Sequence, residues 1–259
     1  MKQIFYKYQG TGNDFVMIDN RKGVFDKHNT SLISHLCNRR TGVGADGLIL
    51  LESDSKYDFR MVYFNADGNE STMCGNGGRC IVSFANFLGI IGKNTEFIAI
   101  DGPHLACIDE GFVELKMQDV LAISSNDNYH ILDTGSPHYV ALKSDLKEID
   151  MNLEGSKIRY SSIFEASGVN VNFAEKMNDK AFAIRTYERG VEGETLSCGT
   201  GATAVAIAMY HSNQTQSKSI VLETQGGTLE VRFEPGSSCY TDVWLCGPTK
   251  QVFKGDFEW

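Results

Sequence analysis

Two short segments carry the strongest fold signal in this sequence: residues 73–79, Met-Cys-Gly-Asn-Gly-Gly-Arg, and residues 197–202, Ser-Cys-Gly-Thr-Gly-Ala. Each contains the pattern Cys-Gly-x-Gly and then enters an apolar stretch typical of a buried helix, which we expect over roughly 76–91 and 199–211. The two cysteines lie 124 residues apart, close to half of the 259-residue chain. Shared motif, helix context and spacing together indicate an internal duplication.

Short strand-like segments surround these helices. They are rich in β-branched and aromatic residues and are bounded by Gly, Asn or Asp, which predicts strands. The expected strands cover 3–9, 14–19, 47–52, 58–65, 95–101, 104–109, 111–118, 129–134, 138–143, 169–175, 180–187, 219–224, 227–234 and 239–246. A further helix is expected over 30–40, with Thr30 or Ser31 as its N-cap.

The predicted fold class is α+β, with two pseudo-symmetric lobes that are each a mainly antiparallel β shell around a central helix. The N-terminal lobe is expected to cover residues 1–118 and the C-terminal lobe residues 119–249, because the chain turns polar over 119–128. We expect the C-terminal segment 250–259 to return to the first lobe as a closing strand.

Composition and charge exclude several classes of protein. Hydrophobic residues make up 42% and charged residues 22%, as in a globular protein, and the net charge is −9. That charge argues against binding to nucleic acid or to an anionic membrane. No apolar run approaches the roughly 18–20 residues that span a bilayer, and the N-terminus does not resemble a secretory signal. We therefore expect a cytoplasmic protein.

The seven cysteines are odd in number, scattered, and without a Cys-x-x-Cys pair. That pattern favours reduced thiols over a disulfide framework or a structural zinc site. It also disfavours a thiol redox protein. Cys80 lies six residues after the first motif cysteine, on a different face of the predicted helix, and is interpreted as a packing residue.

The two motif cysteines, Cys74 and Cys198, are placed where a thiol becomes reactive. A free thiol has a pKa of about 8.5 and is a poor base until it ionises. The N-terminus of a helix offers unpaired N–H groups and partial positive charge, which favour the thiolate and bind anions. If both helices serve one site, a substrate carboxylate binds their ends and one sulfur addresses each face of its α-carbon. This predicts epimerisation, with one sulfur as base and the other as acid.

The paired segments are also compatible with roles that need no carbon-acid chemistry. Glycine-rich turns often precede helices around an inert buried cysteine. A non-catalytic protein that binds a small anionic metabolite would use the same helix ends. A nucleotide-binding loop is disfavoured, because neither segment fits the Walker A or the dinucleotide-binding pattern.

Six segments, taken together, resemble the diaminopimelate epimerase family and follow its order over essentially the whole chain. They are Gly-Thr-Gly-Asn-Asp-Phe (10–15), Gly-Val-Gly-Ala-Asp-Gly (42–47), Asn-Ala-Asp-Gly (65–68), Met-Cys-Gly-Asn-Gly-Gly-Arg-Cys (73–80), Tyr-Glu-Arg-Gly (187–190) and Cys-Gly-Thr-Gly (198–201). Proline racemases and phenazine-biosynthesis isomerases share the fold that this resemblance implies.

The resemblance implies interconversion of LL- and meso-diaminopimelate, a step towards lysine and peptidoglycan, with neither pyridoxal phosphate nor a metal. We also expect a homodimer. An isomerase of the same fold that acts on another amino acid is the alternative within enzymes. The implied catalytic pair is Cys74 and Cys198, with His138 as an assisting residue. The implied substrate-binding residues are Asn13, Asn65, Gly75, Asn76, Asn170, Glu188, Arg189, Gly199 and Thr200.

Three departures from the family pattern put substrate contacts in question. Ser136 stands where the family has Asn, and its shorter side chain would reach substrate through a water. Gly47 occupies a place where some members have Gln. The segment 191–195 is one residue longer than the usual spacing, so the loop before Cys198 is expected to bulge.

Overall fold

The structure, a computed structural model, describes residues 2–164, 167–237 and 239–258. The chain forms two compact units. The first contains Met1–Leu115 and Gly247–Trp259, so both ends of the chain belong to it; the second is Lys116–Cys246. None of the helices in these described ranges is long and apolar enough to cross a membrane.

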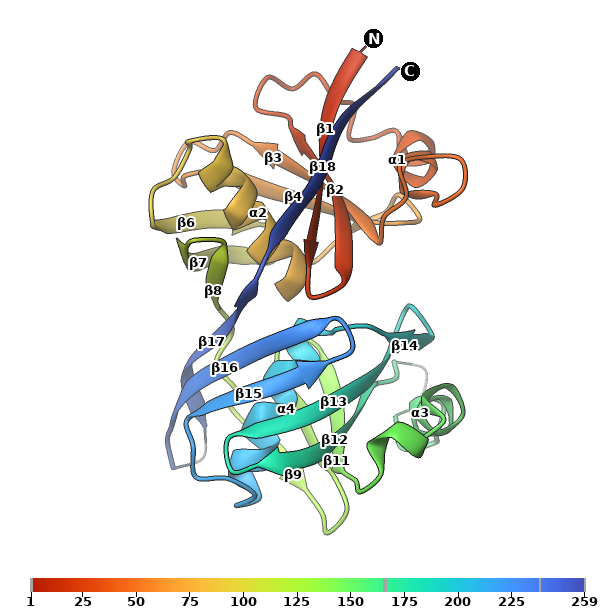
Figure 1. Ribbon diagram of the computed structural model, residues 1–259, viewed down its shortest axis with the longest axis vertical. Helices are drawn as coiled ribbons and strands as arrows, with labels where there is room; N and C mark the ends of the chain where they lie inside the picture. The colour runs from red at the N-terminus through yellow and green to blue at the C-terminus, as the bar shows by residue number, and fades with distance from the viewer. Residues whose placement is uncertain (1, 165–166, 238, 259) are drawn as a thin grey trace. The chain divides into compact units, whose positions relative to one another are not determined.

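The first unit is mostly strands with two helices (Figure 1). Its elements are β1 (Lys2–Gly10), β2 (Asn13–Asp19), α1 (Thr30–Cys37), β3 (Gly47–Glu52), β4 (Arg60–Asn65), β5 (Glu70–Ser71), α2 (Gly75–Phe87), β6 (Asn94–Ala99), β7 (Gly102–Asp109), β8 (Phe112–Lys116) and β18 (Lys250–Glu258). The last strand pairs antiparallel with the first, from Lys2 opposite Glu258 to Gln9 opposite Lys250.

The second unit is also built mostly of strands. Its elements are β9 (Ile123–Ser125), β10 (His130–Asp133), β11 (Pro137–Leu142), the 3₁₀ turn η1 (Leu146–Glu148), α3 (Met151–Arg159), β12 (Asn170–Asn178), β13 (Ala181–Glu188), β14 (Gly193–Thr195), α4 (Gly199–His211), β15 (Ser219–Thr224), β16 (Gly227–Pro235) and β17 (Tyr240–Pro248).

The two units repeat one pairing scheme. In the first, β1–β2, β3–β4, β4–β5, β6–β7 and β7–β8 are antiparallel, while β2–β3 and β4–β6 are parallel. In the second, β10–β11, β12–β13, β13–β14, β15–β16 and β16–β17 are antiparallel, while β11–β12 and β13–β15 are parallel. In both, one helix precedes the third strand of the repeat and another follows the fifth. This is the repeat that the two Cys-Gly segments predict.

The second helix of each repeat packs against several strands of its own unit. The α2 helix contacts β1, β2, β3 and β7, and α4 contacts β10–β13, β15 and β16 (Figure 1). Ten of the thirteen residues of α4 are buried, as its Ala-rich, nearly uncharged sequence predicts.

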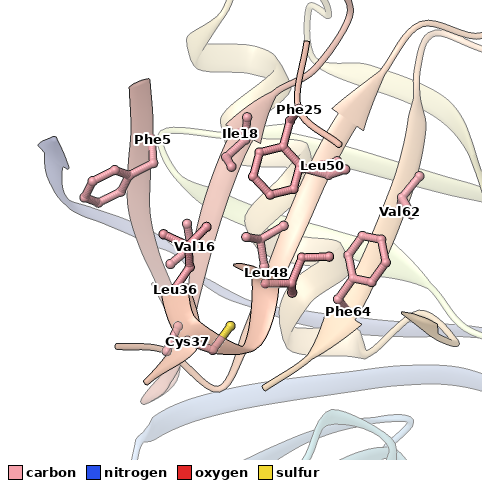
Figure 2. Packing of buried hydrophobic residues seen from close by; sticks show 12 residues of the cluster. Phe5, Val16, Ile18, Phe25, Leu36, Cys37, Leu48, Leu50, Val62 and Phe64 are labelled. Carbon is pink, nitrogen blue, oxygen red and sulfur yellow. The ribbon is translucent and has the colours of Figure 1, made fainter. Parts of the chain in front are cut away.

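Strands β2 and β3 are buried on both faces, which explains their continuous apolar sequences. One face lies under α1, where Val16 and Leu48 belong to a cluster that also contains Phe5, Leu36 and Phe64 (Figure 2). The opposite face meets α2, since a Cβ placed on its Gly77 would lie within 3.5 Å of Phe15, Ile49 and Met61 side chains. Successive side chains in a strand alternate between faces, so this core positions the start of α2.

The boundaries of α1 differ from the prediction. Its N-cap is Asn29, not Thr30 or Ser31, because Oδ1 of Asn29 accepts a hydrogen bond from the N–H of Leu32 at 3.0 Å. The helix also ends at Cys37 instead of residue 40. Asn38 is extended, and its side-chain oxygen accepts hydrogen bonds from the N–H groups of residues 40 and 41, which gives the chain an alternative to another helical turn.

Several elements were not predicted: α3, η1 and the short strands β5, β9 and β14. The sequence of α3 is mostly polar and has Gly155 at its centre. A Cβ at that position would lie 2.5 Å from Cβ of Tyr187, so the helix approaches β13 more closely than any other residue would allow. Tertiary packing, not local propensity, therefore stabilises α3.

Candidate active site

Cys74 occupies the N-cap of α2, with an extended backbone (φ −97°, ψ 134°). It is half-buried, and its Sγ accepts a hydrogen bond from the N–H of Gly77 at 3.4 Å. The sulfur thus lies at the positive end of the helix dipole. The predicted carboxylate-binding residues Gly75 and Asn76 are the first two residues of this helix, where backbone N–H groups lack intrahelical partners.

A line of side-chain hydrogen bonds runs past Cys74. The fully buried Arg79 donates from Nη2 to Oδ1 of Asn76 at 2.6 Å. Asn76 donates from Nδ2 to Oδ1 of Asn13 at 3.3 Å, and Asn13 donates from Nδ2 to Oδ2 of Asp46 at 2.6 Å. Sγ of Cys74 lies 3.6 Å from the same Oδ1 of Asn13. The structure therefore brings three predicted site residues, Asn13, Cys74 and Asn76, into one cluster.

Charged side chains hold the turn around Asn13. Arg39 forms a fork on Asp14, at 2.7 and 3.0 Å, and also contacts Asp46 at 2.6 Å. Lys7, which is buried, pairs with Asp14 at 2.7 Å. Burial opposes ionisation of Asp14, but the hydrogen bonds from Arg39 and Lys7 outweigh it and lower its pKa to about 2.

Asn65 ends β4, opposite Gly47 in the ladder. Its backbone closes a turn, since the N–H of Gly68 donates to its carbonyl at 2.9 Å, and the residue is exposed. Within the described residues, its side chain makes no hydrogen bond to the rest of the cluster. A side chain at position 47 would clash with the neighbouring strand, because a Cβ there would lie 2.5 Å from the carbonyl oxygen of Phe64. This explains the glycine.

Cys198 occupies the N-cap of α4, the position that Cys74 has in α2. It is buried, and its Sγ lies 3.4 Å from the hydroxyl of Thr200. The hydroxyl of Thr134 donates to the carbonyl of Thr200 at 2.9 Å, which ties the start of α4 to the turn between β10 and β11. Gly199 and Thr200, the predicted carboxylate-binding pair, are thus the first two residues of the helix.

His138 on β11 is fully buried and lies among amides and hydroxyls. The hydroxyl of Thr186 donates to Oδ1 of Asn172, so the amide nitrogen of Asn172 faces Nδ1 of His138, at 3.0 Å. Nδ1 is then an acceptor, and the imidazole carries its proton on Nε2, which lies 3.2 Å from Oγ of Ser136. Burial, helped by the positive charge of Arg189, lowers the pKa of His138 to about 3.

The contacts described for His138 connect it to a hydroxyl and an amide. Asn172 in turn packs against the start of α4. A Cβ placed on Gly201 in that helix would lie 2.4 Å from Oδ1 of Asn172 and 3.4 Å from Sγ of Cys198. His138 thus holds the amide against which the start of α4 packs.

Asn170 connects two predicted site segments. Its Nδ2 donates to Oγ of Ser136 at 3.0 Å, and its Oδ1 accepts from the backbone N–H of Arg189 at 2.8 Å. Arg189 donates from Nη1 to the carbonyl of Ser167 at 2.9 Å and stays half-exposed. The carboxylate of Glu188 accepts from the hydroxyl of Thr195 at 3.0 Å.

The lengthened segment before Cys198 forms a four-residue hairpin turn, since Glu188 pairs with Gly193. Glu192 adopts a left-handed backbone (φ 56°), and its N–H donates to the carbonyl of Glu188 at 2.8 Å. Its carboxylate accepts from Arg159 and from the N–H of Gly190, both at 3.2 Å. The turn that carries Arg189 is therefore anchored by the side chain of Glu192.

Sequence reasoning missed three residues that organise these clusters: Asp46, Arg79 and Asn172. Two signals were available. Asn172 follows Asn170 by two residues in a strand, so both face the same side. Arg79 follows Asn76 by three residues in a helix, so both lie on one face. Cys80, predicted as a packing residue, is fully buried, and burial raises its pKa to about 12.

Solved structures share this fold at low sequence identity. A phenazine biosynthesis protein of the PhzF family from Bacillus anthracis superposes with a TM-score of 0.76 at 15% identity over 100% of both chains. A hydroxyproline epimerase from Agrobacterium vitis superposes with a TM-score of 0.69 at 14% identity, covering 98% of this chain and 92% of that one. The fold is that of the class to which PhzF-family proteins and hydroxyproline epimerase belong.

Sequence comparison narrows the class to one family. The profile of the family described as diaminopimelate epimerase matches residues 5–106 and 130–241. A diaminopimelate epimerase from Flavobacterium psychrophilum is 56% identical over 250 residues, which cover 96% of this chain and 98% of that protein. The chain belongs to the diaminopimelate epimerase family.

Proposed function

We propose that this protein epimerises LL-diaminopimelate to meso-diaminopimelate, with Cys74 and Cys198 as the acid/base pair. The observation that carries the proposal is the equivalence of the two cysteines. Each is the N-cap of the second helix in one of two repeats with the same strand order, in a chain of the diaminopimelate epimerase family.

The proposed reaction uses two sulfurs and no cofactor. One cysteine, as thiolate, takes the α-proton, and the electron pair of the C–H bond moves into the carboxylate to give an enediolate. The other cysteine, as thiol, gives its proton to the opposite face, which inverts the configuration. Both sulfurs must reach one α-carbon for this to happen. Helix N–H groups that face the carboxylate stabilise the charge that develops there.

The helix starts supply those donors. Gly75 and Asn76 in α2, and Gly199 and Thr200 in α4, are the proposed ligands of the reacting carboxylate. The absence of a Cβ at the two glycines lets a ligand approach the backbone.

The other amino-acid head of diaminopimelate needs a cation and several acceptors. Arg189 is the proposed partner of its carboxylate, because a guanidinium forms two parallel hydrogen bonds with that group. Glu188, Asn13, Asn65 and Asn170 are proposed to bind ammonium or carboxylate groups. His138 is the proposed assisting residue, and it contacts Ser136 and Asn172.

We further propose that the enzyme works in the cytoplasm as a homodimer, in the biosynthesis of lysine and of peptidoglycan precursors, without nucleic-acid or membrane partners. The net charge of −9 supports the last point. Sedimentation equilibrium of the purified protein tests the dimer; a single monomer mass at micromolar concentration would exclude it.

The activity is tested by incubating the protein with LL-diaminopimelate in D₂O, after dialysis against a chelator and a carbonyl reagent. The proposal predicts meso product that carries deuterium at the inverted carbon. Inversion that requires added pyridoxal phosphate or metal would contradict the two-thiol mechanism, and activity only on other amino acids would contradict the substrate.

A further inference from the structure

Arg159, the last residue of α3, carries a buried positive charge. Its side chain is only 10% exposed, and its Nη2 donates to Oε1 of Glu192 at 3.2 Å. Among the residues that the structure describes, Glu192 is the only carboxylate that pairs with it. A buried guanidinium needs such a partner, because an unpaired buried charge is strongly destabilising. The pair therefore ties the end of α3 to the turn 189–192, which joins β13 to β14.

The guanidinium of Arg159 also packs on the backbone of Gly168. A Cβ placed on Gly168 would overlap Nη1 and Cζ of Arg159, so the guanidinium lies directly against this backbone. The carbonyl of the preceding residue, Ser167, accepts the hydrogen bond from Nη1 of Arg189 at 2.9 Å. Arg159 therefore connects the turn that carries Arg189 with the segment that holds the guanidinium of Arg189.

The carboxylate of Glu192 fixes the conformation of the turn. Oε1 accepts from the N–H of Gly190 at 3.2 Å, and Oε2 accepts from the hydroxyl of Tyr187 at 3.3 Å. Burial opposes ionisation of Glu192. The hydrogen bonds from Gly190 and Tyr160, with the charge of Arg159, outweigh burial and hold the pKa of this carboxyl below its usual value. One ionised side chain therefore joins β13, the turn and α3.

The other contact of the turn leaves this role open. The N–H of Arg189 donates to Oδ1 of Asn170, which fixes the chain where it enters the turn. The next residue is Gly190, with φ 92°, and a glycine is a flexible link. The direction of the turn beyond that point therefore depends on Glu192, and the position of the Ser167 carbonyl depends on Arg159.

The contacts of Arg189 leave one edge of its guanidinium available. Within the described part of the chain, its side chain donates only from Nη1, to Ser167, so Nε and Nη2 remain for a carboxylate. Arg185 shows how this edge is used, because its Nε and Nη2 form a fork on Glu194 at 2.6 and 2.8 Å.

Glu192 belongs to the lengthened loop of this chain. Val191 and Glu192 stand between Gly190 and Gly193, where the family pattern has one residue. Val191 is exposed, so the contacts described above come from Glu192. The link to α3 is therefore associated with the extra residue.

We propose that Arg159 and Glu192 are positioning residues that hold the guanidinium of Arg189 in the orientation that binds the distal carboxylate of the substrate. A guanidinium that is already held in place loses less conformational freedom on binding than a free one, so affinity rises without a new contact. The inference rests on the proposed function, which assigns the distal carboxylate to Arg189.

The test removes both members of the pair at once, in Arg159→Met/Glu192→Ala. This pair variant keeps the net charge of the protein and leaves no unpaired buried charge. Diaminopimelate is added at increasing concentration while the alkylation of Cys74 and Cys198 by iodoacetamide is followed peptide by peptide. The concentration that halves the alkylation rate measures binding without turnover.

Two further proteins distinguish positioning from a general loss of structure. The pair variant is also made in the Arg189→Lys background, because residues that act through Arg189 lose their effect when its fork is gone. Arg185→Met is the matched control. It breaks the pair with Glu194, which is also largely buried and lies in the same hairpin, without touching the turn 189–192.

We expect the pair variant to raise the half-protecting concentration of diaminopimelate at least about fivefold in the wild-type background, and by less than about twofold in the Arg189→Lys background. Arg185→Met should lower the melting temperature but change the half-protecting concentration by less than about twofold.

An equal effect of the pair variant in both backgrounds would overturn the inference, as would an unchanged half-protecting concentration or an equal loss of protection in Arg185→Met. None of these outcomes affects the proposed epimerisation, which is measured separately by inversion in D₂O. If diaminopimelate does not protect even the wild type, the proposed substrate is wrong and this inference fails with it.

Discussion

Nδ2 of Asn172 lies 3.0 Å from Nδ1 of His138, and both side chains are fully buried. Because the amide donates to the imidazole, a proton on Nδ1 would replace a hydrogen bond with a clash of two donors. The pair therefore stabilises the neutral imidazole, in agreement with the pKa of about 3 that burial imposes on His138.

This pair predicts a specific loss of stability in acid. The pKa of His138 is lowered on folding, so its contribution is complete above the unfolded value of about 6.5 and is lost as the pH falls towards 3. Relative to His138→Gln, wild type should lose about 2 kcal/mol in free energy of unfolding between pH 8 and pH 5. Urea unfolding at each pH measures this.

The control for that measurement is His35→Gln, at an exposed position on α1. The pH dependence of the His138→Gln difference is compared with that of this variant. If the His138→Gln difference stays constant between pH 8 and pH 5, the imidazole takes up a proton as readily in the folded as in the unfolded protein, and the assigned hydrogen bonds are wrong.

Arg79→Met should destabilise the first unit by at least about 2 kcal/mol. Arg79 is fully buried and donates to Asn76, to the hydroxyl of Thr11 at 3.1 Å and to the carbonyl of Pro248 at 2.9 Å. Its loss removes these three hydrogen bonds, two of them to the buried residues Asn76 and Thr11. Arg60→Met, which breaks a pair between a half-exposed Arg60 and Asp54, should cost less than about 1 kcal/mol. Similar denaturation midpoints for the two variants would contradict the role assigned to Arg79.

Arg189→Lys keeps the positive charge but loses the planar fork. If Arg189 grips the distal carboxylate, kcat/KM should fall at least about tenfold, with both motif cysteines still alkylated by iodoacetamide. Arg21→Lys, at an exposed pair with Asp19, is the matched control. Near-normal kinetics in Arg189→Lys would remove this residue from the site.

Gly201→Ala should impair both stability and turnover. The added Cβ would lie 2.4 Å from Oδ1 of Asn172 and 3.4 Å from Sγ of Cys198, so the start of α4 must shift, at a cost of about 1–3 kcal/mol. Gly92→Ala is the control, because its Cβ meets nothing within 4 Å. Thermal unfolding and steady-state kinetics of both variants test this prediction. Equal melting temperatures and equal kcat values in the two variants would show that the packing at Gly201 is loose.

Apolar composition predicted the elements that are buried on nearly all sides. The Ala-rich α4 and the apolar β3 are examples, since each is buried on nearly all sides. The helix around Gly155 was missed for the opposite reason. Its sequence is mostly polar, and it packs closely on Tyr187, which lies far along the chain.

The same distinction between local and distant signals separates the site residues that were predicted from those that were missed. Cys74 and Cys198 were predicted because each lies in a local motif with a recognisable chemical purpose. Asp46 and Arg79 were not, because their roles depend on contacts with distant segments: Asp46 reaches Asn13, and Arg79 reaches the turn at Thr11 and the returning chain at Pro248. No local pattern reports these distant contacts; the spacing of Asn76 and Arg79 indicates only that both lie on one face of the helix.

The two-sulfur mechanism requires each sulfur to serve one face of the α-carbon, and single removal of the two cysteines tests this most directly. Cys74→Ala and Cys198→Ala are each incubated in D₂O with LL- and with meso-diaminopimelate, and inversion and deuterium uptake are followed separately. A lone sulfur can take a proton from its own face and return deuterium only there. Paired residues of this kind are not additive, so the stereochemistry of exchange, not its rate, is the deciding readout.

We expect both variants to lose inversion by at least about a hundredfold, the low end of a general acid/base contribution. Any remaining exchange should proceed with retention and on opposite configurations in the two variants, and the double variant should show neither inversion nor exchange. If either single variant still inverts diaminopimelate at more than about a hundredth of the wild-type rate, that cysteine is not an essential base and the two-sulfur mechanism is wrong.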